Sequence, residues 1–592
     1  MNAPIRKTKI VCTMGPNLFE KHLIAPLMKA GMNVARFNFS HGTYETHQHY
    51  YDEVCRIRDE LGLPVATMLD TKGPEIRVRS FKNGHVTLQN GQLFTLTTDE
   101  VEGDEERVSI TYKELPQDIA VGSSILIDDG LIGMQVERID GADIVCRVLN
   151  GGVVSNNKGV NIPNAHLSMP FISEKDHQDI LFAIKNGYDF IAASFTRCAD
   201  DIMQIRHILQ ENNCHTINII AKIENMEGVE NIDEILRVVD GVMVARGDLG
   251  VEVPLEDVPG PWPLAWVPSL QKKLIQRGIA AGKPVITATQ MLDSMIKNPR
   301  PTRAEATDVA NAIYDGTSAI MLSGESAVGA YPVEAVETMV RIALRAEADM
   351  DYIRRFSRDT SASTDVTNAI SHATVTSAHD LNASAIITVT KSGSTARILS
   401  RYRPACVIVG CTTEKHVWRQ LALSWGTVPL MIAEESNTDD LFEHAVDAAV
   451  QNGLVHDGEL VVLTAGVPLG ISGTTNLMKV HVVGHLLSRG LGLHGGKVVA
   501  PLCVIRNLEK DAKDFNTGDV IVCHQTTREM FSMLRKSSAI VLEDDNPEGH
   551  GAIAGMSLDI PVIIGAKNAT NILKSGAVVT VDGEKGTVGA HW

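Results

Sequence analysis

Several features that assign a chain to a special class are missing from this sequence. No stretch approaches eighteen consecutive apolar residues, so no membrane-spanning helix is expected. Residues 1–15 lack the apolar core of a secretory signal and lead directly into an expected strand. The nine cysteines include no C-x-x-C pair and no metal-type spacing, and their number is odd. We therefore expect free thiols in a reducing cytoplasm.

Basic residues are also scarce relative to acidic ones. The formal net charge of −18 argues against a nucleic-acid partner, because binding a phosphate backbone needs a basic surface. It does not exclude small anions, which need only a local positive pocket. With 592 residues, of which 44% are hydrophobic, the chain is too long for one core, and we expect several globular domains.

The first 345 residues repeat a strand-then-helix rhythm. Helical patterns such as residues 176–187 and 303–316 separate eight short apolar runs of the type that forms buried parallel strands. The eight expected strands cover residues 7–13, 33–39, 65–70, 190–195, 217–223, 241–246, 284–289 and 318–322. Eight parallel strands that alternate with helices predict a closed (β/α)₈ TIM barrel, an α/β fold.

Residues 71–168 interrupt this rhythm. The alternating runs at 86–98, 123–139 and 143–150 are broken by Gly, Asn and Asp, which predicts a small antiparallel β-barrel or sandwich. Inserted after the third strand, it lies at the carboxyl face of the main barrel and can act as a lid. The main barrel then comprises residues 1–70 and 169–345.

Two further domains are expected after the barrel. Residues 346–484 return to α/β alternation, with strands at 383–390, 406–411, 428–432 and 459–466. Residues 485–592 are first glycine-rich and then carry apolar β runs, which indicates a separate C-terminal module.

Lys222, Glu224 and Asp248 are the most informative residues. Lys222 and Glu224 end one expected strand and are two positions apart, so their side chains leave the strand on the same face. Asp248 follows the next strand. A lysine with two carboxylates suits a divalent cation and an oxyanion, as in phosphoryl or enolate chemistry. Taken alone, the same residues could also form a structural ion pair.

Polar side chains also end the second and third strands. Asn, Ser, Asp and Thr oxygens are hard ligands for an alkali or alkaline-earth cation, and arginines can grip a phosphate or carboxylate. The residues concerned are Arg36, Asn38, Ser40, His41, Asp70, Thr71, Lys72, Glu75 and Arg77. Each alone could cap a strand, but their concentration at successive strand ends points to a site.

The later strands add further candidates. Gly247 and Gly250 flank Asp248, and backbone N–H groups there could cradle a carboxylate. Thr289 ends the seventh strand, where its hydroxyl could join a proton relay, bind an oxyanion or cap a helix. Ser323 and Glu325 follow the eighth strand at the rim.

A second phosphate-binding pattern follows a strand of the third domain. Small and hydroxyl residues open a helix there, in the series Thr390, Lys391, Ser392, Gly393, Ser394 and Thr395. Such a turn offers N–H and hydroxyl donors to a phosphate, although it is often only a helix cap. Residues 464–476 form an expected companion loop.

Seven strings together resemble the pyruvate kinase family. They are RFNFSHG (36–42), LDTKGPEIR (69–77), AKIEN (221–225), ARGDLG (245–250), ATQMLDSM (288–295), PTRAEATDVANAIYDG (301–316) and MLSGESAVG (321–329). They occur in the family's order. The resemblance implies transfer of the phosphoryl group of phosphoenolpyruvate to ADP, giving pyruvate and ATP in glycolysis.

The resemblance also implies roles for individual residues. Lys222 would stabilise the transferring phosphoryl group and the enolate oxygen. Glu224 and Asp248 would hold Mg²⁺ or Mn²⁺, with Gly247 and Thr289 beside the substrate. Asn38, Ser40, Asp70 and Thr71 match the K⁺ site. Arg36, Asn38, His41, Arg77 and Lys158 match phosphate and ATP contacts. Glu75 is typical of K⁺-dependent members, whereas Val78 replaces a common Thr.

Regulation and assembly are implied in the same way. The 390–395 turn matches an allosteric phosphate loop, so a sugar phosphate or nucleotide monophosphate is the expected effector. The family is usually a homotetramer. We expect no membrane partner.

The C-terminal module resembles the phosphohistidine domain of phosphoenolpyruvate-utilising enzymes. The matching strings are GDVIVCHQTT (518–527), SSAIVLEDD (537–545) and GMSLDIPVIIGAKNAT (555–570). His550 falls where the phosphorylated histidine would lie, but Glu548-Gly549 replace the usual Thr-Ser before it. Because an acidic neighbour repels a phosphoryl group, a structural or regulatory role is favoured over a phosphocarrier.

Two other classes of function remain as alternatives. A barrel lyase of the pyruvate aldolase type also uses Glu and Asp on Mg²⁺ to stabilise an enolate, but it needs neither the inserted domain nor Lys222 and Lys158. A catalytically silent phosphate sensor is disfavoured by the intact Lys222, Glu224 and Asp248.

Overall fold

A computed structural model describes residues 5–590 apart from 164, 254–266, 358–364, 436, 457, 467–474 and 485. The chain forms two compact units, which are described separately. One comprises residues 1–372, 388–431 and 470–475, and the other comprises residues 373–387, 432–469 and 476–592. No helix in the described ranges is both long and apolar enough to cross a membrane.

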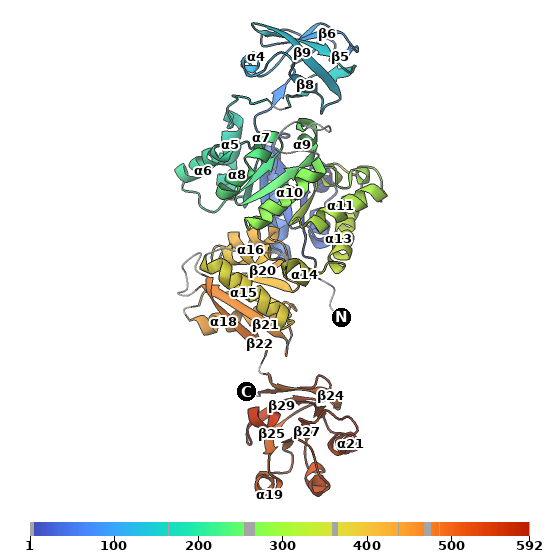
Figure 1. Cartoon of the computed structure of the whole chain (residues 1–592), viewed down its shortest axis with the longest axis vertical. Coiled ribbons are helices and arrows are strands. Elements are labelled where there is room, and N and C mark those ends of the chain that lie inside the picture. Colours follow the sequence, from blue (N-terminus) through green and yellow to red (C-terminus); the bar gives the residue numbers. More distant parts are fainter. Residues whose placement is uncertain are drawn as a thin grey trace. The chain divides into compact units, whose positions relative to one another are not determined.

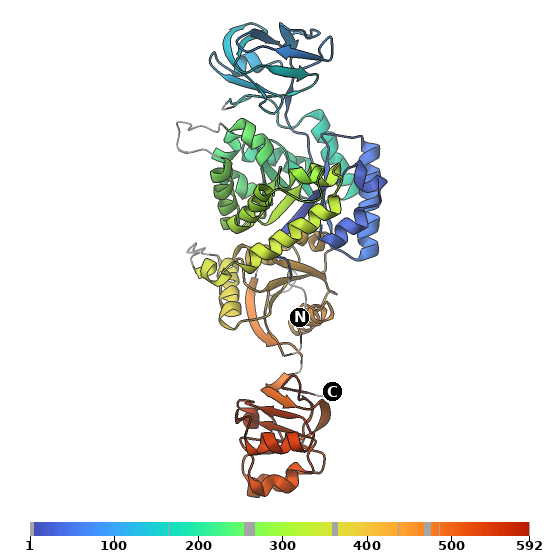
Figure 2. The same ribbon diagram turned by 90° about the vertical axis from the view of Figure 1, so that its right-hand side faces the viewer.

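Eight parallel strands close into the predicted barrel, and helices ring them (Figures 1 and 2). The strands are β1 (Lys9–Thr13), β2 (Val34–Asn38), β3 (Ala66–Asp70), β13 (Phe190–Ala193), β14 (Asn218–Ile223), β15 (Gly241–Ala245), β16 (Val285–Ala288) and β17 (Ala319–Leu322). Their order around the barrel is β1-β17-β16-β15-β14-β13-β3-β2. The eight-stranded prediction is confirmed, and each expected strand overlaps its observed one, with ends displaced by at most two residues.

The barrel strands form because their residues are apolar and largely β-branched, and nearly all are buried on both faces. Capping boxes begin α5 at Ser173 and α11 at Thr302. The helices of this region are α1 (Pro16–Glu20), α2 (Ile24–Ala30), α3 (Tyr44–Leu61), α5 (Glu174–Asn186), α6 (Ala199–Glu211), α7 (Met226–Glu230), α8 (Ile232–Val238), α9 (Arg246–Glu252), α10 (Val267–Ala280), η1 (Asp293–Ile296), α11 (Arg303–Asp315), α12 (Gly324–Ala327), α13 (Pro332–Ala348) and α14 (Tyr352–Ser357).

The insert after β3 is a β domain with its own apolar core. Its elements are β4 (Ile76–Arg77), β5 (His85–Leu88), β6 (Leu93–Thr97), β7 (Arg107–Ser109), α4 (Leu115–Asp118), β8 (Ser124–Ile127), β9 (Ile132–Asp140), β10 (Asp143–Val148), β11 (Gly152–Ser155) and β12 (Gly159–Asn161). They form a seven-stranded sheet and a two-stranded ribbon. The pairing is antiparallel as predicted, except that β6 and β7 run parallel.

The α/β region begins with α15 (Val366–Asp380). It continues with β18 (Ala385–Val389), α16 (Ser394–Arg401), β19 (Val407–Thr412), α17 (Lys415–Gln420), η2 (Leu421–Leu423), β20 (Thr427–Met431), α18 (Thr438–Gln451), β21 (Leu460–Gly466) and β22 (Thr475–Val482). All four strands expected here are present. β19 and β20 pair in parallel, with Ile408 opposite Thr427.

The C-terminal residues build an eight-stranded mixed sheet in the order β23-β30-β29-β25-β26-β27-β28-β24. The strands are β23 (Leu486–Arg489), β24 (Leu491–His494), β25 (Lys497–Ile505), β26 (Val520–Cys523), β27 (Ala539–Leu542), β28 (Val562–Ile564), β29 (Val578–Asp582) and β30 (Thr587–Ala590). The helices are α19 (Leu508–Asp511), η3 (Ala512–Asp514), η4 (Arg528–Met530), α20 (Phe531–Leu534), α21 (His550–Ser557) and α22 (Ala569–Ile572). Alternate residues of β25–β27 fall into two separate apolar cores.

The cysteines that are fully buried in the domain cores include Cys12, Cys146, Cys411 and Cys523. Burial raises the pKa of the Cys411 thiol to about 12, and that of Cys523 likewise, so neither thiol carries charge near neutral pH.

Candidate active site

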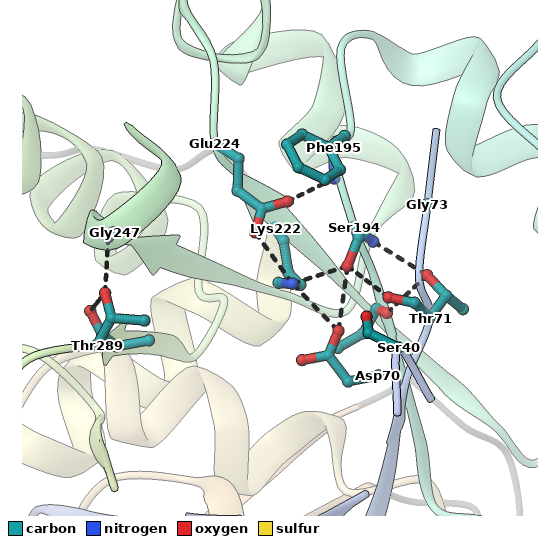
Figure 3. Close-up of polar contacts among 12 residues, drawn as sticks. Ser40, Asp70, Thr71, Gly73, Ser194, Phe195, Lys222, Glu224, Gly247 and Thr289 are labelled. Atoms are coloured by element: carbon teal, nitrogen blue, oxygen red, sulfur yellow. Dashed lines mark hydrogen bonds and ion pairs between the residues drawn. The ribbon is translucent and has the colours of Figure 1, made fainter. Parts of the chain in front are cut away.

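The predicted residues meet at the carboxyl ends of β2, β3, β13 and β14 (Figure 3). The barrel's register brings them together, because Asn38 at the end of β2 lies opposite Asp70 at the end of β3. The catalytic groups of such barrels lie at this end of the strands.

Lys222 contacts three other polar side chains at the centre of the barrel mouth. Its ammonium lies 3.1 Å from Asp70 Oδ1 and 3.0 Å from Glu224 Oε1, and it donates to Ser194 Oγ at 2.7 Å (Figure 3). Burial alone would lower the pKa of Lys222, but the carboxylates of Asp70 and Glu224 outweigh burial and raise the pKa above its ordinary value. Lys222 is therefore charged at neutral pH, although only 8% of it is exposed.

Asp70 is shared between two cations. Arg36 Nε donates to Asp70 Oδ2 at 2.5 Å, and Arg36 Nη1 donates to Thr13 Oγ1 at 2.8 Å. Burial raises the pKa of Asp70, yet Arg36 and Lys222 together hold that pKa below its usual range. The carboxylate is therefore ionised, and it fixes the positions of both cations.

Ser194 belongs to this cluster, but it was missed by the sequence reasoning. Its hydroxyl accepts from Lys222 and lies 3.1 Å from Asp70 Oδ1 and 2.7 Å from the Thr71 carbonyl. Its backbone N–H donates to Thr71 Oγ1 at 3.2 Å. The available signal was its place directly after β13, beside the ends of β3 and β14.

Glu224 and Asp248 form the predicted pair of acidic residues. Glu224 is 1% exposed and accepts from the backbone N–H of Phe195 at 2.6 Å. Burial raises the pKa of Glu224 to about 7 against the opposing charge of Lys222, and burial also raises the pKa of Asp248. One buried and one half-buried carboxylate, both with raised pKa values, suit a divalent cation, whose positive charge would favour their ionised forms.

The backbone N–H of Gly247, which was expected to bind a substrate carboxylate, is already engaged in this structure. This N–H donates to Thr289 Oγ1 at 2.7 Å, and the Thr289 hydroxyl itself donates to the Ala288 carbonyl at 2.6 Å (Figure 3). Thr289 has a φ of 69°, a left-handed conformation that is rare for a β-branched residue. A substrate group that binds Gly247 N–H must therefore displace this hydroxyl.

The remaining residues of the expected cation site lie on the same rim. Asn38 Oδ1 accepts from the Ser40 N–H at 3.2 Å, and Thr71 is buried beside Ser194. The side chain of Ser40 is exposed, as is that of His41.

The basic residues expected to contact phosphate or nucleotide lie beside acids in the insert. Arg77 lies 2.5 Å from Glu75, which is also 3.8 Å from Lys72. Lys158 lies 2.8 Å from Asp128. All three basic side chains remain partly exposed.

A cleft of about 180 Å³ separates the insert from the barrel mouth. Its walls include Glu75 and Asp129 on the insert side and Asp248 on the barrel side. Asn161 Nδ2 donates to Glu252 Oε1 across it at 2.7 Å. The insert therefore forms one wall of a cleft that reaches Asp248 at the barrel mouth.

Two charged residues, Glu325 and Arg246, stabilise the loops around the barrel mouth. Glu325 is buried and accepts from the backbone N–H groups of Leu292 and Ser323, so it anchors the rim. Arg246, a further residue that the sequence reasoning missed, pairs with Asp308 at 2.7 Å and donates to the Thr289 carbonyl at 2.6 Å.

The expected effector turn connects β18 to α16. Thr390 and Thr395 are buried and Lys391 is exposed, while Gly393 takes a φ of 78° that favours glycine. The companion loop falls largely on residues 467–474, outside the described residues. At its end, Thr475 Oγ1 lies 2.6 Å from Thr395 Oγ1.

His550 opens α21 in the C-terminal module and is exposed. Its Nδ1 lies 2.9 Å from Thr526 Oγ1, and Glu548, also exposed, stands two positions before it.

A closed (β/α)₈ barrel with a buried lysine, an arginine and several carboxylates at its carboxyl mouth, beneath an inserted β domain, defines a TIM-barrel enzyme with a charged substrate. Family models match three parts of the chain: the pyruvate kinase barrel domain over residues 5–336, the pyruvate kinase alpha/beta domain over 368–481 and the PEP-utilising enzyme mobile domain over 515–586. The chain belongs to the pyruvate kinase family. It is a phosphotransferase, and this activity implies phosphoenolpyruvate and ADP as substrates.

Individual relatives agree over nearly the whole length. The chain is 48% identical to pyruvate kinase of Geobacillus stearothermophilus over 586 residues, which cover 98% of each chain. It is 48% identical to pyruvate kinase of Bacillus licheniformis over 587 residues, 99% of each. A solved pyruvate kinase from Cryptosporidium parvum matches with a TM-score of 0.75 and 40% identity, covering 81% of this chain and 96% of that one.

Proposed function

We propose that this enzyme transfers the phosphoryl group of phosphoenolpyruvate to ADP with Mg²⁺ (or Mn²⁺) as an obligatory cation and K⁺ as an activator. The observation that carries the proposal is Lys222, a charged lysine buried between Asp70 and Glu224 at the barrel mouth. A loose phosphoryl-transfer transition state needs positioned positive charge rather than a covalent nucleophile. Lys222 and Arg36 supply such charge in a fixed place.

The divalent cation fits Glu224 and Asp248. Mg²⁺ is commonly held by one or two carboxylates, with substrate oxygens and water completing its shell. Both carboxylates become more fully ionised when a cation binds, since burial raises both their pKa values. Bound Mg²⁺ would supply electrostatic stabilisation of the enolate and phosphoryl oxygens.

The monovalent cation fits the rim of β2 and β3. Asn38, Ser40, Asp70 and Thr71 offer neutral and charged oxygens, the donor set that hard cations prefer. Glu75 lies close to both Arg77 and Lys72, and its carboxylate reduces the positive charge that would repel K⁺ in that part of the insert. This supports K⁺ activation even though Val78 replaces the more common Thr.

Arg36 would hold the transferring phosphate, because Asp70 and Thr13 fix its guanidinium at the mouth. On the nucleotide side, Asn38, His41, Arg77 and Lys158 would contact ADP or ATP. Arg77 and Lys158 exchange weak carboxylate partners for nucleotide phosphates when the substrate arrives.

The carboxylate of phosphoenolpyruvate would bind near Gly247 and Asp248, next to Thr289. On the enol side, the Thr289 hydroxyl is hydrogen-bonded to Gly247 and Ala288, so it can hold or pass a proton at the enolate carbon through water. Ketonisation of the enol then drives transfer toward ATP.

The assay for this function is ATP formation from phosphoenolpyruvate and ADP with Mg²⁺, with and without K⁺. We expect turnover that requires Mg²⁺ and rises with K⁺. Absence of ATP formation, with pyruvate released by carbon–carbon cleavage of a hydroxy-acid instead, would favour the barrel lyase. Absence of any turnover would favour a phosphate sensor.

Allosteric control is proposed through the turn at 390–395. Buried hydroxyls at Thr390 and Thr395, the positive φ at Gly393 and the start of α16 support a phosphate cradle for a sugar phosphate or nucleotide monophosphate. Replacing Thr390 and Ser392 with Asp should remove activation and leave the unactivated rate unchanged. Persistent activation in that variant would contradict the assignment. We further propose a cytoplasmic homotetramer.

The domain division at residues 70/71, 168/169, 345/346 and 484/485 is part of the same proposal. For the C-terminal module we propose a structural or regulatory role, supported by Glu548 beside His550. After incubation with phosphoenolpyruvate, intact-mass analysis should show no added phosphoryl group in either the unmodified chain or His550→Ala. A phosphorylated unmodified chain would refute this role.

A further inference from the structure

A small cleft with a strongly basic lining lies at the opposite end of the barrel from Lys222. Its walls come from the amino ends of β16 and β17, from α16 and from the segment before β20. Its charged and hydroxyl-bearing members are Lys283, Ser318, Arg397, Ser400, Arg401, Arg403 and Ser424. Of the described residues that line it, four are cationic and none carries a carboxylate, in a chain whose formal net charge is −18.

The acidic group nearest to this cleft is already engaged. The charge of Asp240 favours the protonated forms of Lys283 and Arg397. However, its carboxylate already pairs with Arg206 at 2.7 Å and accepts from the Ile219 N–H at 2.9 Å. Burial lowers the pKa of Lys283, and Arg397 and Arg206 lower it further. The lysine is thus surrounded by more positive charge than negative charge.

Arg403 is the clearest case of a positive charge in this cleft whose described hydrogen-bond acceptors are all uncharged. Its described acceptors are neutral: the Gly316 carbonyl at 2.8 Å, Ser318 Oγ at 3.0 Å and the Ser400 carbonyl at 3.1 Å. Its Nε is buried and has no hydrogen-bond partner among the residues that the structure describes. Burial lowers the pKa of Arg403 to about 9. A buried guanidinium N–H without an acceptor is costly unless a further group binds there.

We propose that this basic cleft is a binding site for a small tetrahedral oxyanion, either free phosphate or the phosphate end of a small ester. Guanidinium groups and hydroxyls are the donors that bind phosphate in fixed geometry. The interior of the cleft has a volume of only about 10 Å³, which is room for about one water. The phosphate therefore binds at the open mouth of the cleft, where Lys283 and Arg401 are partly exposed, and any ester group extends into solvent.

This site is distinct from the proposed effector turn but is connected to it. Arg397 lines the basic cleft and also donates from Nη2 to the Ser392 carbonyl at 2.8 Å. An anion that holds Arg397 therefore steadies the backbone of the 390–395 turn. This connection rests on the proposed regulatory function, whereas anion binding itself does not.

Binding is measured on the full chain by isothermal titration calorimetry with inorganic phosphate, with chloride at equal ionic strength as the reference because salt screens charge. Lys283→Gln and Arg401→Gln each remove one cation of the cleft. We expect each to weaken phosphate binding by about tenfold or more, since a hydrogen bond to a charged group contributes about 1.5–3 kcal/mol. Arg401→Lys keeps the charge and should retain most of the affinity.

Arg345→Gln is the matched control, because Arg345 is an exposed arginine on α13 that pairs with Asp349 at the surface. It should bind phosphate like the unmodified chain. Unchanged phosphate affinity in both cleft variants overturns the proposal, as does loss of binding only in Lys222→Met or in Thr390→Asp, where phosphate would occupy the catalytic mouth or the effector turn. These outcomes do not depend on turnover, so they are separate from a failure of the proposed function.

A second measurement covers the case in which a cleft variant does not fold. Crystals of the unmodified chain soaked in tungstate should show anomalous density between Arg403 and Lys283, and a cleft without density overturns the proposal. Repeating the titration with glycerol 3-phosphate distinguishes the two sources of the anion. Tighter binding of the ester indicates a phosphorylated metabolite, and tighter binding of inorganic phosphate indicates the free ion.

Discussion

Replacing Lys222 with Met tests the catalytic assignment most directly. The substitution keeps the length of the side chain but removes the charge that lies 3.0–3.1 Å from Glu224 and Asp70. Loss of one preorganised donor to a developing oxyanion costs about 10²–10³ in kcat. Because Lys222 carries a full charge in a buried site, we expect a loss of about a thousandfold, equivalent to about 4 kcal/mol.

The effect on stability should be smaller than for an ordinary buried pair. Removing one partner of a buried ion pair costs about 3–5 kcal/mol. Here Asp70 keeps Arg36 at 2.5 Å, and Glu224 keeps the Phe195 N–H and can take up a proton, since its pKa is raised to about 7. We therefore expect about 3 kcal/mol at most, and a folded protein.

The assay is the rate of ATP formation with saturating phosphoenolpyruvate, ADP and Mg²⁺, together with circular dichroism of the folded state. Lys272→Met is the matched control, because Lys272 pairs with Asp315 on the outer surface of the barrel. It should retain normal kcat. A Lys222→Met enzyme with kcat within tenfold of the unmodified enzyme would refute the role of this lysine.

Three further outcomes follow from the contacts. Ser194→Ala should lower kcat about tenfold or more through loss of the hydrogen bond to the Lys222 ammonium; an unchanged kcat would show that the serine does not position the lysine. Glu325→Gln leaves one of the two backbone N–H groups facing an NH₂ donor without an acceptor and the other with a neutral acceptor, so the thermal midpoint should fall, by about 1–3 kcal/mol in stability; an unchanged midpoint would contradict this anchor. Burial, with help from Arg6, lowers the pKa of Lys9 to about 7 in the folded state, against 10.5 ordinarily. The unfolded chain therefore binds the extra proton between these values, and stability should rise with pH above 7 by up to about 1.4 kcal/mol per unit. In Lys9→Met this part of the rise of stability with pH should vanish. If the thermal midpoint of the variant rises between pH 7 and 9 as steeply as that of the unmodified chain, the lowered pKa of Lys9 is refuted.

The barrel and its central trio could be predicted because their signals are local. Each strand is a short, largely β-branched run, and strands buried on both faces read as continuous apolar segments. Lys222 and Glu224 share a face through the two-residue period of a strand. The barrel geometry then places the ends of successive strands at one mouth.

The supporting contacts could not be predicted because they depend on long-range geometry. Ser194 joins Lys222 across 28 positions, and Arg246 reaches Asp308 across 62. The hydrogen bond from the Gly247 N–H to the Thr289 hydroxyl depends on a left-handed backbone at Thr289. Sequence patterns do not predict this conformation for a β-branched residue. The sequence therefore predicted which groups gather but not which of them are already engaged.

The two ends of the barrel treat buried positive charge in opposite ways. At the catalytic mouth, carboxylates surround Lys222 and raise its pKa, so its charge is secured before any substrate arrives. In the basic cleft, the described acceptors around Arg403 are carbonyls and hydroxyls, and burial lowers its pKa to about 9. A cation that is already balanced by carboxylates, as Lys222 is, suits catalysis because it needs no reorganisation when the substrate binds. The charge of Arg403 is met by neutral acceptors and by the Trp425 ring, 4.7 Å away, and an anion bound there would stabilise it further. This difference favours the cleft as a site whose occupancy alters stability.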